Sequence, residues 1–144
     1  MEIYIASKYI SHKLLNERLW LILTKNDIKC FLPQSININA VSQEQMKDVS
    51  EKCYQALERC DVILVVSPFG QSVSCEIGYS IALQKKGNEK HIIVYNYNNQ
   101  EELWKNEAMI LPYVEAQFNN FDELIEYCKE LKQKYNYKNY IWKV

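Results

Sequence analysis

One acidic side chain, Glu76, stands where an α/β protein would place a reactive carboxylate. The segment Cys60–Leu83 predicts a buried strand, a short polar loop and a helix that opens on this residue. Ligands of open α/β sheets bind where a parallel strand ends in such a loop. A carboxylate there can reach the reacting atom of a ligand, as a nucleophile or as an acid or base. Glu76 is therefore the first candidate for a catalytic residue.

Two interpretations of Glu76 compete. Acidic residues are common in the first turn of any helix because they complement the helix dipole, and that dipole would help to keep Glu76 ionised. Gly78, two residues further along, favours a functional site. A glycine inside a helix costs about 1 kcal/mol relative to alanine and therefore needs a reason. We expect the missing side chain to give a ligand or another backbone room beside the carboxylate.

Other familiar reaction centres are missing from the sequence. The chain contains only three glycines and has no GxGxxG or GxxxxGK[ST] motif, so the usual binding loops for dinucleotide cofactors and for transferred phosphoryl groups are missing. It also has no GxSxG motif, which would mark a serine nucleophile. The five cysteines form no CxxC motif, and His12 and His91 are isolated. We therefore expect neither a metal site nor a cofactor. Cys75 lies near a helix start but has no histidine close in sequence, which favours a small packed residue.

The composition of the chain limits which partners and which cellular compartment we expect. The 144 residues fit one domain, and the formal net charge is −1 without a basic patch, which argues against nucleic acid as a partner. Apolar runs such as Val62–Val66 are too short to span a bilayer. Met1 leads directly into a strand-like segment, so we expect no signal peptide, no membrane partner and a cytoplasmic location.

The elements that must position Glu76 alternate between strand and helix. Strands are expected at Glu2–Ala6, Lys29–Leu32, Asp61–Val66, His91–Tyr95 and Val114–Phe118. Helices are expected at Ser11–Lys25, Ser42–Arg59, Ser74–Lys85, Glu101–Met109 and Asp122–Lys134, with Ser11 as a cap and a capping box at Ser42. This alternation implies right-handed crossovers between parallel strands. It predicts an α/β, flavodoxin-like three-layer sandwich with a central five-stranded parallel sheet.

The C-terminal end differs in composition from the rest of the chain. We expect the domain to cover residues 1–134 and a tyrosine-rich tail, which also carries Trp142, to cover residues 135–144. Aromatic side chains bury a large area and serve cores and interfaces alike. The tail is therefore either an interface or a strap that packs on its own domain.

Five motifs in order carry a family resemblance: IYIAS, FLPQ, CDVILVV, CEIGYSIAL and IIVYN. Together they resemble the nucleoside 2-deoxyribosyltransferase family and the related nucleotide N-glycosidases. The resemblance covers about Met1 to Phe118, and the pattern E-[IL]-G-Y is its most specific element. It implies a flavodoxin-like fold, cleavage of an N-glycosidic bond, and assembly into a homodimer or a larger homo-oligomer.

The resemblance also implies roles for single residues. Glu76 matches the family's nucleophile, Tyr4 matches the tyrosine that orients it, and Gln34 lies in the loop that contacts the base. An Asp or Ser of the family corresponds to Gly70, where nearby serines can substitute and hold a sugar hydroxyl or a 5′-phosphate. The segment Asn106–Met109 resembles a motif that reaches the site of a neighbouring subunit. The substrate-binding candidates are Ser7, Gln34, Gly70, Ser72, Ser74, Gly78 and Met109.

One position departs from the family pattern. The acid that protonates the leaving base corresponds to Cys53, which is a poor acid and which also fits a core position on its helix. Three functions stay open. The first is an enzyme that cleaves a nucleoside or nucleotide through a glycosyl-Glu76 intermediate and transfers the sugar to a free nucleobase or to water. The others are a non-catalytic nucleotide-binding module and an interaction domain of the same fold.

Overall fold

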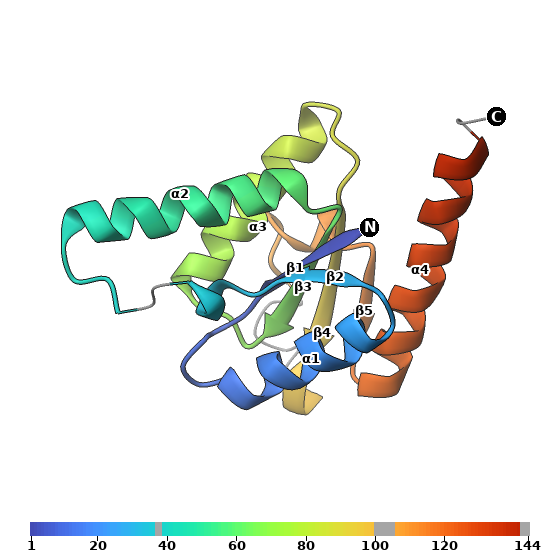
Figure 1. The fold of residues 1–144 in the computed structure, drawn as a ribbon, viewed down its shortest axis with the longest axis horizontal. Helices are drawn as coiled ribbons and strands as arrows, with labels where there is room; N and C mark the ends of the chain where they lie inside the picture. The colour runs from blue at the N-terminus through green and yellow to red at the C-terminus, as the bar shows by residue number, and fades with distance from the viewer. Residues whose placement is uncertain (37–38, 100–105, 142–144) are drawn as a thin grey trace.

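The computed structural model describes residues 1–36, 39–99 and 106–141. Its centre is a parallel sheet with the strand order β2-β1-β3-β4-β5. The strands are Glu2–Ala6 (β1), Lys29–Phe31 (β2), Val62–Ser67 (β3), His91–Asn96 (β4) and Ala116–Phe118 (β5). The α-helices are Lys13–Lys25 (α1), Gln43–Arg59 (α2), Gln71–Lys85 (α3) and Phe121–Ile141 (α4) (Figure 1). Short 3-10 helices lie at Pro33–Ser35, Tyr97–Asn99 and Leu111–Tyr113. The predicted flavodoxin-like three-layer sandwich is confirmed.

The strand order explains which helices share a face. The chain moves from β1 to β2 at one edge, returns across β1 to β3, and then proceeds outward through β4 and β5. Because crossovers between parallel strands are right-handed, this reversal places α1 on one face of the sheet and α2 and α3 on the other. The helix α4 follows β5 and packs on the face of α1. Parallel strands that diverge at a reversal leave a crevice at their carboxyl ends.

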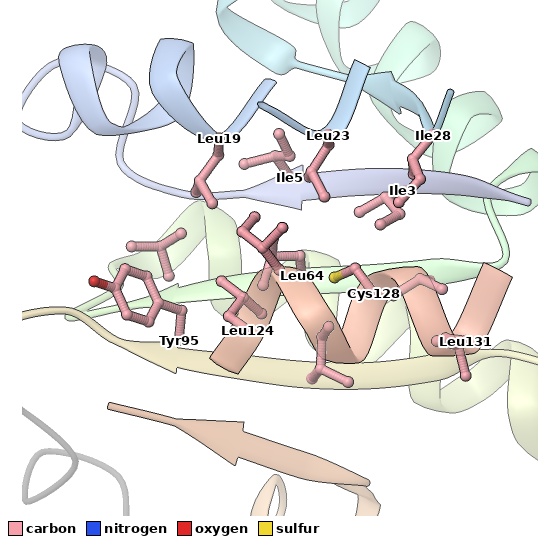
Figure 2. Packing of buried hydrophobic residues seen from close by; sticks show 14 of the residues in the cluster. Ile3, Ile5, Leu19, Leu23, Ile28, Leu64, Tyr95, Leu124, Cys128 and Leu131 are labelled. Atoms are coloured by element: carbon pink, nitrogen blue, oxygen red, sulfur yellow. The ribbon is translucent and has the colours of Figure 1, made fainter. Parts of the chain in front are cut away.

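Alternation along the strands divides the core between the two faces. Ile3, Ile5 and Leu64 point toward α1 and α4, where they pack against Leu19 and Leu124 (Figure 2). The intervening residues of the same strands belong to a second cluster with α2 and α3. Its members in β1 and β3 are Tyr4, Ala6, Ile63 and Val65. Since successive side chains of a strand point to opposite faces, Tyr4 has to face the α3 layer.

Three helix boundaries differ from the sequence prediction. The helix α1 begins at Lys13, and its N-cap is His12 without a side-chain hydrogen bond, so Ser11 is not the cap. The helix α3 begins at Gln71 rather than Ser74, because Gly70 is its N-cap and the polar residues after it continue the helix. The helix α4 continues to Ile141, well beyond the predicted end at Lys134. Residues 135–141 are therefore helical, and the prediction for Trp142 lies outside the described residues.

The predicted helix Glu101–Met109 is only partly described. Residues 101–105 lie outside the described residues, and residues 106–109 form a turn rather than a helix. Within the described part of the chain, no helix combines the length and the apolar character that a membrane crossing requires.

The start of α2 follows the sequence prediction closely. The Ser42 hydroxyl accepts a hydrogen bond from the Gln45 backbone N–H at 3.1 Å, and the Gln45 side chain accepts one from the Ser42 backbone N–H at 3.1 Å. This reciprocal pair is the predicted capping box. It satisfies backbone donors that the helix itself leaves without partners.

Ser42→Ala is expected to lower the free energy of unfolding by about 1 kcal/mol, because it leaves a backbone N–H of α2 without its acceptor. Urea unfolding followed by circular dichroism measures this. Ser50→Ala is the matched control in the same helix, since the Ser50 hydroxyl only bonds back to the Lys47 carbonyl. An equal loss in both variants would contradict a capping role for Ser42.

Candidate functional site

Tyr4 and Glu76 meet between the sheet and α3. The Tyr4 hydroxyl donates a hydrogen bond to Glu76 Oε1 at 2.7 Å. Tyr4 is fully buried and stacks on Phe31 of the neighbouring strand, with ring centroids 5.3 Å apart. This packing leaves the tyrosine little rotational freedom, so its hydroxyl fixes the position of the carboxylate. The contact is the one that the sequence resemblance predicts; the catalytic roles of the two residues stay predictions.

The two carboxylate oxygens of Glu76 have different surroundings. Oε1 accepts the hydrogen bond from Tyr4, whereas Oε2 is buried and has no hydrogen-bond partner among the described residues. A buried carboxylate oxygen without a donor is poorly stabilised, because nothing replaces the water that it has lost. Of the two oxygens, only Oε1 therefore has a hydrogen-bond donor among the described residues.

The ionisation of Glu76 differs from the sequence prediction. Burial raises its pKa from 4.5 to about 7, and the hydrogen bond from Tyr4 only partly offsets this. The helix dipole does not hold Glu76 ionised, because α3 begins at Gln71 and Glu76 lies beyond its first turn, where the dipole acts. Glu76 therefore holds its proton to a higher pH than an exposed glutamate does.

The Tyr4 hydroxyl keeps its proton over the whole working range of pH. Burial raises the pKa of Tyr4 far above its usual value, and the charge on Glu76 raises it further. Tyr4 can therefore act toward Glu76 only as a hydrogen-bond donor. It orients the carboxylate and does not give up its own proton.

Glu76 lines a pocket of about 480 Å³ at the carboxyl ends of β1 and β3, where the strand order reverses. The wall from α2 is mostly apolar and comprises Met46, Val49, Ser50, Cys53 and Tyr54. The opposite wall carries the hydroxyls of Ser7, Tyr9 and Ser72. An apolar wall facing a few polar groups is the usual composition of a small-molecule site.

A second pocket, of about 350 Å³, adjoins the first. The two pockets share Ser7, Tyr9, Ser72 and Val73. The second one extends along the loop after β1 and past the beginning of α3, where it is also lined by Lys8, Ile10, Ser11, Gly70 and Gln71. A ligand bound next to Glu76 therefore has room to extend toward the N-terminus of α3.

The structure brings some of the predicted substrate-binding residues to Glu76 and leaves others elsewhere. Ser7 and Ser72 line the same pocket as Glu76, and Gly70 lines the adjoining one. Ser74 is exposed, and its hydroxyl bonds to the Gly70 carbonyl. Met109 is also exposed and lines neither pocket of its own chain.

Gln34 does not line the pocket of Glu76. Its side-chain carbonyl accepts a hydrogen bond from Asn16 at 3.0 Å, and it lines a separate depression beside β2. The preceding residue, Pro33, does line the pocket of Glu76. The FLPQ segment therefore contributes to the pocket through its proline, because the glutamine is drawn toward α1.

Gly78 lies away from the Glu76 pocket. A residue two positions along a helix is rotated by about 200°, so Gly78 faces away from the carboxylate. Gly78 is exposed, and a Cβ built on it would meet no atom within 4 Å. The space expected beside Glu76 is instead provided by the reversal of the sheet and by the position of α2.

Sequence reasoning missed the α2 wall and one contact of Ser7. Met46, Val49 and Cys53 recur at spacings of three and four in the otherwise polar segment Gln43–Cys53, a pattern that indicates one common face. His12, which looks isolated in the sequence, lies beside Ser7 with Nδ1 at 3.1 Å from the Ser7 hydroxyl. No local pattern predicts this contact, since it depends on the turn of the loop after β1.

Cys53 lies in the pocket as a neutral thiol. Burial raises its pKa, and a hydrogen bond with Tyr4 partly offsets this effect. Cys53 thus carries a proton beside the Tyr4–Glu76 pair, but it is a weaker acid than the carboxyl group that the family pattern has at this position. Glu76 is the only carboxylate among the described residues that line the pocket.

Comparison with known proteins identifies the fold but does not assign a family. No family model matches the sequence, and no curated protein matches it at a significant level. A 2-deoxyribosyltransferase from Bacillus psychrosaccharolyticus has a similar structure, with a TM-score of 0.67, 16% identity, and coverage of 87% of this chain and 90% of that chain. A conserved protein from Enterococcus faecalis V583 matches with a TM-score of 0.57, 17% identity, and coverage of 93% and 98%. The resemblance found in the motifs thus extends to the fold.

Glu76→Gln is expected to raise the free energy of unfolding, relative to the wild-type protein, by more at pH 8 than at pH 5. A carboxyl group whose pKa is raised by folding contributes stability below its unfolded pKa of 4.5, and this contribution is lost as the pH rises through about 7. Because glutamine cannot ionise, the variant escapes this loss, which amounts to about 2 kcal/mol between the two pH values. Urea unfolding at pH 5 and pH 8 measures the difference. Glu130→Gln, at an exposed position of α4, is the control.

Proposed function

We propose that this protein cleaves the N-glycosidic bond of a nucleoside or nucleotide through a covalent intermediate on Glu76. One observation carries the proposal: a buried carboxylate has one oxygen held by Tyr4 and the other without a described partner, in a pocket at the switch point of the sheet. The likeness in fold to a 2-deoxyribosyltransferase supports a nucleoside as the kind of substrate.

In the first step, ionised Glu76 attacks C1′ of the sugar through Oε2. A bond forms between Oε2 and C1′, the bond between C1′ and the base nitrogen breaks, and its electron pair leaves with the base, which takes up a proton from solvent. Such displacements pass through a state with oxocarbenium character. Tyr4 holds Oε1 throughout and keeps the carboxylate aimed at C1′.

In the second step, an acceptor replaces Glu76 at C1′. A nucleobase acceptor gives sugar transfer, and a water acceptor gives hydrolysis. Two successive displacements at one carbon restore its configuration, so the product keeps the stereochemistry of the substrate.

The pocket suits a nucleoside in size and in the distribution of polarity. Its volume of about 480 Å³ lies in the range of small-molecule sites. The apolar wall from α2 and the ring of Tyr9 offer a surface for the base, and the hydroxyls of Ser7 and Ser72 offer partners for the sugar. In this proposal, Gln34, Ser74 and Gly78 of one chain do not contact the substrate.

Assembly into a homodimer or larger homo-oligomer is also part of the proposal. Met109 is 76% exposed and lies in the segment that resembles a motif reaching a neighbouring subunit. The last turns of α4 expose Tyr137, Tyr140 and Ile141 as well. An exposed apolar residue outside the pocket of its own chain is available to a second copy.

A non-catalytic nucleotide-binding module is the second candidate function. One observation favours it: the pocket has a thiol, Cys53, where the family pattern has an acid. Such a module would bind a nucleoside or nucleoside monophosphate without releasing its base.

Glu76→Gln is expected to lower the rate of base release from deoxynucleosides and nucleoside monophosphates by at least a thousandfold, as expected when a catalytic nucleophile is removed. Chromatography of the released base measures the rate, and intact-protein mass spectrometry detects the glycosyl adduct on the wild-type chain. Glu130→Gln should keep wild-type activity. Substrate binding without any release of base by the wild-type protein would instead support the module.

Tyr4→Phe is expected to shift the acidic limb of the kcat/KM profile to higher pH. In the wild-type protein this limb reports the ionisation of Glu76 and lies near pH 7. The variant loses the hydrogen bond that lowers the pKa of Glu76, so ionisation requires a higher pH. Tyr137→Phe, at an exposed position of α4, should leave the limb in place. An unchanged limb in Tyr4→Phe would exclude Tyr4 as the group that tunes Glu76.

A further inference from the structure

The proposed reaction leaves one proton without an acceptor. In the second step, water or a nucleobase must lose a proton as it bonds to C1′. Glu76 cannot accept this proton, because it is esterified at that stage. A further base is therefore needed in the pocket or in contact with it.

Few groups in the pocket meet this requirement. Among the described residues that line it, the Cys53 thiol keeps its proton because its pKa is raised, and the exposed Cys75 thiol has no hydrogen bond to a base. The Ser50 hydroxyl donates to the Lys47 carbonyl. Isolated Ser and Tyr hydroxyls are too weakly basic to act alone. The Ser7 hydroxyl differs from them, because His12 Nδ1 lies 3.1 Å from its oxygen.

The fold fixes the geometry of the Ser7–His12 pair. Both residues are 8% exposed and lie in the loop between β1 and α1. The His12 backbone N–H donates to the Lys8 carbonyl at 3.0 Å, which closes this loop. The imidazole also makes an edge contact with Tyr97, with ring centroids 5.6 Å apart. Ser7 lines the pocket of Glu76, whereas His12 does not line it and contacts Ser7.

The surroundings of His12 favour its neutral form. Burial lowers its pKa, and the positive charge of Lys8 lowers it further. The Ser7 hydroxyl and the Tyr97 ring also lie beside the imidazole. A neutral imidazole protonated at Nε2 presents Nδ1 as an acceptor for the Ser7 hydroxyl.

We propose that Ser7 and His12 form a proton relay that activates the acceptor in the second half-reaction. The acceptor bonds to C1′ and gives its proton to Ser7 Oγ, as the Ser7 proton moves to His12 Nδ1. The bond between C1′ and Glu76 Oε2 breaks, and its electron pair returns to the carboxylate. The imidazolium then loses its proton to solvent. This inference rests on the proposed function and adds Ser7 as a catalytic residue, with His12 acting through it.

Single-turnover and steady-state measurements on Ser7→Ala and His12→Asn test the relay. The asparagine side chain can still accept a hydrogen bond from Ser7 but cannot take up a proton. Both variants should release base in the first turnover at the wild-type rate, while steady-state turnover falls by about a hundredfold or more. The glycosyl-Glu76 adduct should then accumulate in mass spectra. His91→Asn, at the opposite end of the sheet, is the control and should behave as wild type.

Azide distinguishes a relay from a structural role. It is an anionic nucleophile with no proton to lose, so it should restore turnover in both variants and yield a glycosyl azide. A variant with a damaged pocket would not be restored. Equal losses in both half-reactions, or unchanged steady-state turnover, would overturn the relay while the wild-type adduct still supports Glu76 as nucleophile. If the wild-type protein forms no adduct and releases no base, the proposed function fails and the relay fails with it.

Discussion

The desolvation of one carboxylate against the sheet is the constraint on which the site depends. Glu76 is withdrawn from water by α3 and β1, and a single hydrogen bond from Tyr4 compensates only one of its oxygens. The stability of the domain therefore has to come from elsewhere, mainly from the two apolar clusters on either side of the sheet. Burying a carboxylate with so few hydrogen-bond partners costs folding free energy, and such costs are tolerated at functional sites.

The sheet makes this arrangement possible through its two regular features. The two-residue period of β1 sends Tyr4 toward α3 while Ile3 and Ile5 complete the opposite cluster. The strand order reverses between β1 and β3, and this reversal opens a crevice at the carboxyl ends of the strands. The crevice adjoins the face of the sheet that carries Tyr4. Ser7 follows directly after β1, so this strand and the next residue supply both the tyrosine bonded to Glu76 and a hydroxyl that lines the same pocket.

Much of the fold follows from the sequence because its signals are local. The unbroken apolar run of β3 and the Ser42–Gln45 box predict their elements from neighbouring residues alone. The sequence places the start of α3 too late, because Gln71 and Ser72 are polar residues next to a glycine and therefore resemble a loop. In the site, motif resemblance predicts the Tyr4–Glu76 contact. The Ser7–His12 contact and the positions of Gln34 and Gly78 depend on loop geometry and helical phase, which no short pattern encodes.

The helix α2 is buried to different extents along its length. Its buried residues are Ala56 and Leu57, near the C-terminal end, whereas residues 43–48, in the N-terminal part, are exposed (Figure 1). Met46, which lines the pocket, belongs to this loosely held part. Segments with few buried contacts open locally at a free energy far below that of global unfolding. This part of the pocket wall can therefore open locally to admit a molecule while the sheet and the Tyr4–Glu76 pair stay folded.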